Sequence, residues 1–353
     1  RGHSALLDID RAGLDHIIEQ IFGIHPPGDP GAAVLVLVDG EVVTERTYGM
    51  ASVELQVPFT ADHVVRLPYS EGREFIALAA ALMEQDGLLH LDDPVRATFP
   101  NLPAWADPVT ILDLIHHRSG FVDEWSVLLL MHATMTNRFD ESQFLRLLAE
   151  QPRPEVEPGT GYLYSNSDYG LLGLILERAT GGDLPGYMRR RMFAPLGMDS
   201  THLVSNFRAV IPNGAAFYAG HGDGLQYQPL KTSPGGNYAI ATTAADLARW
   251  GMANSDPASD VTRAARRLME DATVVPGRPG HFTFGRTVEV RDGLEIVRHE
   301  GVLECNYLTR VPALGLAVVT FTNRYYEVGE NVAVVDFILG TGPDGAKLRF
   351  PSE

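Results

Sequence analysis

The sequence predicts a mixed α/β protein in which one antiparallel sheet is built from both chain ends, with a mostly helical region inserted between them. Strand-like runs occupy the beginning and the last third of the 353 residues, and helical periodicity dominates from about Ser70 to Ala248. Apolar residues make up 45% of the chain and charged residues 21%, which is typical of a globular protein. We therefore expect a sheet domain at 1–65 and 240–353, a helical domain at 66–239, and an active site in the cleft between them.

The N-terminal and central elements follow from periodicity and turn signals. Residues 8–22 carry apolar side chains at helical spacing and predict a helix. The β-rich runs on either side of Asp39 and Gly40 predict a hairpin, because this dipeptide adopts the positive φ angles of a type I′ turn. Further helices are predicted at 74–86, 109–117, 141–150, 168–180, 184–193 and 244–253.

The C-terminal third predicts the strands that complete the sheet. Four strand-like runs are expected, at 281–290, 294–299, 304–311 and 315–322. The Arg291-Asp292-Gly293 segment supplies the turn between the first two runs, and a closing helix is expected at 328–339. The sequence does not give the order of the strands.

Charge and composition narrow the classes of partner and cofactor. A net charge of −17 argues against nucleic acid and anionic membranes, because both are bound through basic patches. No apolar run approaches the roughly 18–20 residues that span a bilayer. Cys305 is the only cysteine, so we expect no disulfide within the chain and no cysteine-based zinc site, and no cofactor is indicated. A small molecule is the expected partner, with the oligomeric state left open.

The chain as given begins at Arg1 without a signal peptide, which favours a cytoplasmic location. Because it also lacks an initiator Met, a trimmed upstream signal would instead indicate export. Its basic residues are almost all arginines, since Lys231 and Lys347 are the only lysines.

The first candidate motif is Ser70-Glu71-Gly72-Arg73, directly before the apolar helix predicted at 74–86. At a helix N-terminus the backbone N–H groups point outward, and they would stabilise an oxyanion or an acyl intermediate on such a serine. Serine is also a preferred N-cap, and a nearby glutamate favours the same helix end, so this fragment alone favours a cap.

The second motif is Tyr164-Ser165-Asn166, in the predicted turn ahead of the helix at 168–180. A phenol and an amide two residues apart could face one cleft, where the phenol would exchange a proton and the amide would hold a substrate carbonyl. Asparagine is common in turns, so this motif alone is weak.

The third motif is His299-Glu300-Gly301, at the end of a predicted strand. A histidine in this position can titrate near neutral pH, and the glycine would let a substrate backbone approach the strand. A lone histidine at a strand end is nevertheless more often structural than catalytic.

In this order and spacing the motifs resemble those of the serine β-lactamase and penicillin-binding protein superfamily, closest to its class C β-lactamase, D-alanyl-D-alanine carboxypeptidase and esterase branch. That superfamily carries S-x-x-K, Y-x-N, and K-T-G or H-x-G. The resemblance extends over most of the chain, through "GLLHLDDPVRATFPNLP", "ILDLIHHRSGF", "MFAPLGMDSTHL", "PGGNYAIATTAADLARWG" and "VVTFTNR". It implies the predicted fold, with an active site in the cleft between the two domains.

The resemblance also assigns roles to residues of this sequence. Counting back from Asp92-Asp93-Pro94 aligns Ser70 with the nucleophile and Arg73 with the lysine of S-x-x-K. Tyr164 and Asn166 match Y-x-N, and His299 and Gly301 match H-x-G. The oxyanion hole would consist of the backbone N–H groups of Ser70 and Val302. Tyr69 replaces the small residue that usually precedes the serine, and we place it beside the substrate.

Arg73 departs from the family pattern in a way that changes the mechanism. A lysine at this position helps to remove the serine proton because burial and neighbouring charge lower its pKa. Arginine side chains stay protonated in proteins, so Arg73 cannot act as that base. Glu71, Glu74 and Glu300 are candidates to pair with Arg73, which would hold it away from the serine.

Three functions stay open. In the first, Ser70 attacks an ester or amide with Tyr164 as base, assisted by His299, and the protein is a serine hydrolase or acyltransferase. In the second, Arg73, Tyr164 and His299 bind an anionic substrate and move protons, as in a lyase, isomerase or cyclase. In the third, the protein binds a ligand without catalysis. We favour the first, and we expect no ordinary β-lactamase activity because deacylation also needs a base near Ser70.

A few other residues are interpreted from their context. Trp125 and Tyr238 are expected to line the cleft, although large aromatic residues are more often core. Glu300 is a candidate substrate contact, and an acid in the non-acylating reaction. His116 and His117 are interpreted as packing residues, because a third ligand for a metal is lacking nearby in the sequence.

Overall fold

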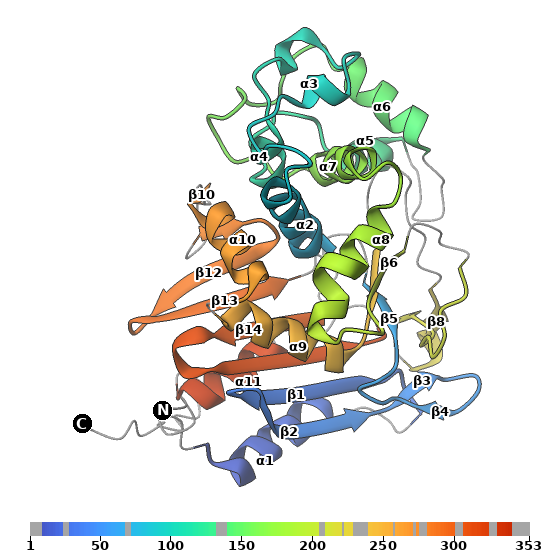
Figure 1. The fold of residues 1–353 in the computed structure, drawn as a ribbon. Coiled ribbons are helices and arrows are strands. Elements are labelled where there is room, and N and C mark those ends of the chain that lie inside the picture. Colours follow the sequence, from blue (N-terminus) through green and yellow to red (C-terminus); the bar gives the residue numbers. More distant parts are fainter. Residues whose placement is uncertain are drawn as a thin grey trace.

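The computed structural model describes residues 9–23, 28–67, 72–131, 140–204, 209–220, 222–228, 239–256, 258–270, 273–274, 281–300, 306–324 and 330–340. These residues form an antiparallel sheet flanked by helices, which confirms the predicted fold class (Figure 1). None of their helices is long and apolar enough to cross a membrane.

The main sheet unites the two ends of the chain. Its eight described strands have the order β10-β11-β12-β13-β14-β15-β1-β2. Their bounds are Thr273–Val274 (β10), His281–Thr283 (β11), Arg286–Arg291 (β12), Leu294–Glu300 (β13), Asn306–Val311 (β14), Leu316–Thr322 (β15), Ala32–Val38 (β1) and Glu41–Tyr48 (β2). Strand β1 pairs with β15 along its full length, from Ala32 opposite Thr322 to Val38 opposite Leu316. The N-terminal hairpin therefore continues the sheet formed by the C-terminal strands.

Helices cover both faces of this sheet. On one face, α1 (Arg11–Phe22) and α11 (Glu330–Leu339) pack on the even-numbered residues of β1. On the other face, α9 (Ala244–Ser255) and α10 (Asp260–Met269) share a core with the odd-numbered residues of the same strand. Because side chains alternate between the faces of a strand, an all-apolar strand such as β1 is buried on both sides.

Two hairpin turns lie where the sequence predicts them, and a third was missed. Asp39 and Gly40 have φ angles of 50° and 86°, and the Asp292-Gly293 turn has 50° and 79°. The predicted strand at 281–290 is wrong, because Phe284 (φ 36°) and Gly285 (φ 80°) divide it into β11 and β12. Phenylalanine is an unusual residue at positive φ, so the sequence gives little sign of this turn.

Helix α2 (Arg73–Gln85) is the central helix of the structure, and its first residues reach the predicted site. Every residue from Arg73 to Met83 is buried, which explains why the segment is apolar on all sides. The helix contacts both α7 (Asn166–Ala179) and α10. Four alanines, at 77 and 79–81, allow these neighbours to approach closely.

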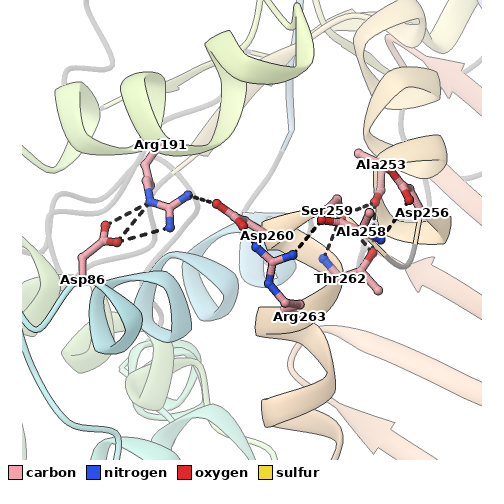
Figure 2. Close-up of polar contacts among 9 residues, drawn as sticks. All are labelled: Asp86, Arg191, Ala253, Asp256, Ala258, Ser259, Asp260, Thr262 and Arg263. Carbon is pink, nitrogen blue, oxygen red and sulfur yellow. Dashed lines mark hydrogen bonds and ion pairs between the residues drawn. The ribbon is translucent and has the colours of Figure 1, made fainter.

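Charged contacts hold the C-terminal end of α2 against its neighbours (Figure 2). Arg191, in the π-helical turn η4 (Arg189–Phe193), donates to Asp86 through Nε at 3.0 Å. Its Nη1 also donates to Asp260, at the start of α10, at 2.5 Å. Ser259 caps α10 by accepting from the backbone N–H of Thr262, and its hydroxyl donates to Ala253 O on α9 at 2.6 Å. Single surface ion pairs contribute little, but this network links four helical segments.

The remaining helices are close to the predicted ranges. They are α3 (Val95–Thr98), α4 (Ile111–Ile115), α5 (Glu124–Leu130), α6 (Glu141–Ala149) and α8 (Leu184–Met188), with short 3₁₀ turns at Ala104–Ala106, Ala194–Leu196, Gly222–Gly224 and Pro312–Leu314. Helices α3, α5 and α10 have no counterpart among the predicted helices. Helix α4 is shorter than the range 109–117, because a capping box at Thr110 and Asp113 fixes its start.

Smaller sheets connect the helical region to the main sheet. They comprise β5 (Val65–Leu67), β9 (Ala239–Thr242) and β6 (His202–Val204) in the order β5-β9-β6, β3 (Met50–Ser52) with β4 (Val57–Pro58), and β7 (Tyr218–Ala219) with β8 (Gln226–Tyr227). The domain boundaries at 65/66 and 239/240 stay predictions, and both fall within strands of the β5-β9-β6 sheet.

Candidate active site

The N-terminal end of α2 meets the Y-x-N motif through Arg73. The Arg73 Nη2 donates a hydrogen bond of 2.6 Å to Asn166 Oδ1, at the start of α7. The guanidinium carbon lies 4.4 Å from the centroid of the Tyr164 ring and 5.2 Å from that of Tyr169. The structure thus brings together three of the predicted site residues, and it directs the Arg73 cation toward an amide and two aromatic rings.

Asp123 fixes the orientation of Asn166. Its Oδ1 accepts both the backbone N–H and the side-chain Nδ2 of Asn166, each at 2.7 Å. The amide oxygen of Asn166 is thereby turned toward Arg73, which is the only arrangement that satisfies both neighbours. The other oxygen of Asp123 accepts the backbone N–H of Ser126 at 2.9 Å and caps α5. Sequence reasoning missed this role, although Asp123 carries the ordinary signal of an N-cap.

Tyr164 is held by ring contacts on two sides. The Arg73 guanidinium lies over its ring, and the His117 ring lies with its centroid 4.9 Å away. Among the described residues the buried Tyr164 hydroxyl has no hydrogen-bond partner. An unpaired buried hydroxyl is costly in a packed interior, so the Tyr164 hydroxyl is a polar group for which the described contacts give no structural role.

A buried pair of His117 and Asp168 lies next to Tyr164, with the His117 ring in contact with the Tyr164 ring. His117 Nδ1 lies 2.8 Å from Asp168 Oδ2, and the Ser119 hydroxyl donates to the other carboxylate oxygen. Burial lowers the pKa of His117 well below its usual value, and the Arg73 charge adds to this effect. Burial also raises the pKa of Asp168 well above its usual value. These contacts agree with the prediction that His117 is a packing residue.

His299, near the end of β13, meets α2 through Glu74. Its Nδ1 lies 2.6 Å from Glu74 Oε2, and its Nε2 is buried without a partner among the described residues. Glu74 is fully buried and also accepts from Arg310 Nη1 at 3.0 Å and from Trp250 Nε1 at 3.2 Å. The first two residues of α2 therefore contact two different motifs, Arg73 the Y-x-N motif and Glu74 the H-x-G motif.

The predicted pairing of Glu74 with Arg73 is wrong. Glu74 faces the sheet, where Arg310 and His299 bind it, while Arg73 faces α7. Consecutive side chains of a helix point about 100° apart, so Arg73 and Glu74 reach different neighbours, α7 and the main sheet. Burial raises the pKa of Glu74, but the charges of Arg310 and Arg286 outweigh it and hold that pKa well below its usual range.

Arg286 adds a second buried cation beside Glu74. It lies directly opposite His299 in the register of β12 and β13, and its guanidinium carbon is 3.9 Å from the centroid of the Phe284 ring. Burial lowers the pKa of Arg286 to about 9, so the side chain remains charged at neutral pH. Its Nε and Nη2 have no hydrogen-bond partner within the described part of the chain.

Several predicted site residues lie outside the described residues. They are Tyr69, Ser70, Gly301 and Val302, together with Glu71 and Tyr238, and the side chain of Glu300 is likewise not described. Their roles, including the oxyanion hole, stay predictions. Trp125 is half-buried on α5, two residues after Asp123. No group of three or more His, Cys, Asp or Glu side chains suited to a metal occurs in the described ranges.

Comparison with known protein families identifies the family of this chain. Residues 24–340 match the model of the Beta-lactamase family. The chain belongs to the Beta-lactamase family. This confirms the superfamily that the sequence motifs indicate, while the exchange of lysine for Arg73 stays a prediction from the alignment of motifs.

Curated relatives of this β-lactamase-family chain include D-aminopeptidases. That of Gluconobacter oxydans (strain 621H) is 29% identical over 279 residues, which cover 78% of this chain and 52% of the relative. That of Cereibacter sphaeroides (strain ATCC 17029 / ATH 2.4.9) is 27% identical over 354 residues, covering 96% and 66%. The chain therefore spans between about half and two thirds of the length of these relatives.

Solved structures share the fold. The D-amino acid amidase from Ochrobactrum anthropi SV3, complexed with L-phenylalanine amide, has a TM-score of 0.74 at 24% identity, covering 93% of this chain and 98% of that one. An octameric penicillin-binding protein homologue from Pyrococcus abyssi has a TM-score of 0.77 at 22% identity, covering 96% and 79%. A class C β-lactamase has a TM-score of 0.74 at 20% identity, covering 95% and 98%.

Proposed function

We propose that this protein is a serine hydrolase or acyltransferase that acts on an ester or amide of a small molecule. The observation that carries the proposal is the arrangement at the start of α2. Arg73 bonds Asn166 of the Y-x-N motif, and Glu74 bonds His299 of the H-x-G motif. Both motifs therefore converge on the helix end that directly follows Ser70 in the sequence.

In this proposal Ser70 attacks the acyl carbon and Tyr164 accepts the serine proton. Within the described ranges the buried hydroxyl of Tyr164 has no hydrogen-bond partner, and this supports its role as a proton carrier, since ring contacts hold the side chain without engaging its oxygen. Asn166 would orient the substrate carbonyl. The backbone N–H groups of Ser70 and Val302 would stabilise the oxyanion, with Tyr69, Glu300, Gly301 and Trp125 as further substrate contacts.

The relatives support an acyl substrate. Curated relatives are named D-aminopeptidase, and one structural neighbour is named D-amino acid amidase, so both names describe the cleavage of an amide. The Arg73 side chain would alter the charge of the pocket relative to a lysine-bearing site. We therefore propose the ester or amide class without assigning the amine or alcohol that leaves.

The proposal is tested by labelling the protein with a fluorophosphonate and with an activated ester, followed by intact-mass spectrometry. We expect one adduct per chain that maps to Ser70, disappears in Ser70→Ala and forms more slowly in Tyr164→Phe. Ser255→Ala is a matched control, because its hydroxyl donates to Gly251 O within α9 and takes no part in the contacts of the site. Absence of any adduct at Ser70 would rule out acyl transfer.

A second candidate is a non-acylating lyase, isomerase or cyclase that binds an anionic substrate through Arg73, Tyr164 and His299. The buried cation of Arg286, directly opposite His299, favours this alternative because it adds positive charge beside the site. Turnover of a carboxylate substrate by Ser70→Ala would support it. Binding of such a ligand without turnover would instead indicate a non-catalytic binding protein.

A further inference from the structure

The Glu74–His299 contact has the form of a buried carboxylate–imidazole pair. Glu74 is 0% exposed and His299 is 3% exposed, and their Oε2 and Nδ1 atoms are 2.6 Å apart. The edge of the Phe75 ring lies against the imidazole, with centroids 5.9 Å apart. Both the hydrogen bond and the ring contact fix the orientation of His299, because a buried side chain with a charged partner has little freedom to rotate.

The partners of Glu74 determine which nitrogen of His299 carries the proton. Arg310 and Trp250 are donors only, so they bind Glu74 as an acceptor, and the charges of Arg310 and Arg286 keep it ionised. An ionised carboxylate can only accept, so Nδ1 must carry the hydrogen of this bond. In the neutral imidazole the lone pair therefore lies on Nε2, the atom without a partner in the described part of the chain.

We infer that His299, oriented by Glu74, is a proton acceptor for the nucleophile, so that the site contains a base without the lysine of S-x-x-K. This inference rests on the proposed acyl transfer and adds a second proton carrier to Tyr164. A neutral imidazole can accept a proton directly, whereas a phenol must first release its own. Nucleophile, base and orienting carboxylate then form the arrangement that activates serine in unrelated hydrolases.

The proton and bond changes balance without a cofactor. The Oγ–H proton of Ser70 passes to His299 Nε2 while Oγ forms a bond to the acyl carbon and the carbonyl electrons move to oxygen. The bond to the leaving nitrogen or oxygen then breaks, and Nε2 returns its proton to that atom. In deacylation water replaces the leaving group: Nε2 takes a proton from water, the new C–O bond forms, the ester bond to Oγ breaks, and the proton goes to Oγ.

The charged groups around the Glu74–His299 pair come from three elements. Glu74 on α2 faces Nδ1, while Arg286 on β12 and Arg310 on β14 approach the same carboxylate. Arg73, the neighbour of Glu74 on α2, is directed toward Asn166. Two arginines, Arg286 and Arg310, therefore lie beside the carboxylate that orients His299.

The test uses p-nitrophenyl acetate hydrolysis and fluorophosphonate labelling of the whole chain. Glu74→Gln keeps the shape of the side chain but removes its charge, and we expect kcat/KM to fall at least about 10-fold with little change in KM. The pH–rate profile should also change, because the substitution removes the negative charge that faces Nδ1 of His299. Glu74→Asp should retain the wild-type profile.

Two further variants separate this role from a structural one. Glu289→Gln also removes a carboxylate that binds arginines, here Arg298 at 2.6 Å, and it should leave the pH profile unchanged. His299→Ala should lose activity and recover part of it with added imidazole. The imidazole rescue keeps the inference testable if Glu74→Gln, which leaves Arg310 without its carboxylate, does not fold.

The outcomes are distinct for the inference and for the proposed function. If wild type labels at Ser70 and His299→Ala labels at the same rate, the inference is wrong and the proposed function stands. If His299→Ala slows labelling, imidazole restores it and Glu74→Gln shifts the pH profile, the inference is supported. If wild type does not label at Ser70, the proposed function fails and the inference with it.

Discussion

Substitution of Gly285 tests whether the β11–β12 hairpin packs tightly against the start of α2. Gly285 has a φ of 80°, and a Cβ placed there would lie 2.7 Å from the Glu74 amide nitrogen and 2.8 Å from Arg73 Cβ. Gly293 occupies the equivalent position of the next hairpin, with a φ of 79° and nothing within 4 Å of its Cβ position. The two glycines share a backbone conformation and differ in their surroundings, so alanine substitutions at the two sites form a matched pair.

The structure predicts a different loss in the free energy of unfolding for each alanine variant. An alanine at positive φ costs about 1–2 kcal/mol, so Gly293→Ala should lower the free energy of unfolding by that amount. Gly285→Ala adds contacts under 3.0 Å with buried backbone and Cβ atoms, and overpacking of this kind costs about 1–3 kcal/mol more. We expect Gly285→Ala to be destabilised by about 2–5 kcal/mol in total.

Urea denaturation followed by circular dichroism measures both free energies of unfolding. Because Gly285 touches the two residues that contact the Y-x-N and H-x-G motifs, its variant should also label with fluorophosphonate more slowly, while Gly293→Ala labels at the wild-type rate. Equal destabilisation by the two substitutions would show that the hairpin does not press on α2, and would remove the packing argument for the placement of Arg73 and Glu74.

Three further predictions follow from single contacts. Asp123→Ala removes the cap of α5 and both hydrogen bonds to Asn166, so the free energy of unfolding measured in denaturant should fall by about 2–3 kcal/mol. A fall of less than about 0.5 kcal/mol would contradict these contacts. Arg73→Lys should label at Ser70 faster than wild type above neutral pH, since a buried lysine can lose its proton; equal rates would mean that the lysine position no longer limits acylation. The contribution of His117 to the free energy of unfolding should fall by up to about 1.4 kcal/mol per pH unit as pH decreases below about 6.5, because unfolded chains take up a proton that folded His117 resists. The raised pKa of Asp168 acts in the opposite direction, because the folded carboxyl holds a proton that the unfolded chain releases. The contribution of His117 is therefore the difference between wild type and His117→Asn, which suits the φ of 54°, in urea titrations at several pH values.

The sequence alone determined the class of fold, and it predicts most residues of the candidate site. Period-2 and period-3.6 patterns reflect which side chains meet the core, and this is a local property of strands and helices. The Asp39-Gly40 and Asp292-Gly293 turns were predictable for the same reason, because their residue types favour positive φ. Motif order and spacing further predict Tyr164, Asn166, Arg73 and His299 as site residues, and they indicate the superfamily that the family match confirms.

Only the tertiary structure decided which of these side chains are partners. Arg73 and Glu74 are neighbours in sequence with opposite charges, yet one contacts α7 and the other contacts the sheet. Glu74 meets His299 and Arg310 across more than 220 positions of the chain. Such pairings depend on how helices dock on a sheet, and local periodicity contains no information about docking. The H-x-G motif predicts His299 as a site residue, but local periodicity does not place its strand beside α2, so the contact of His299 with Glu74 is visible only in the tertiary structure.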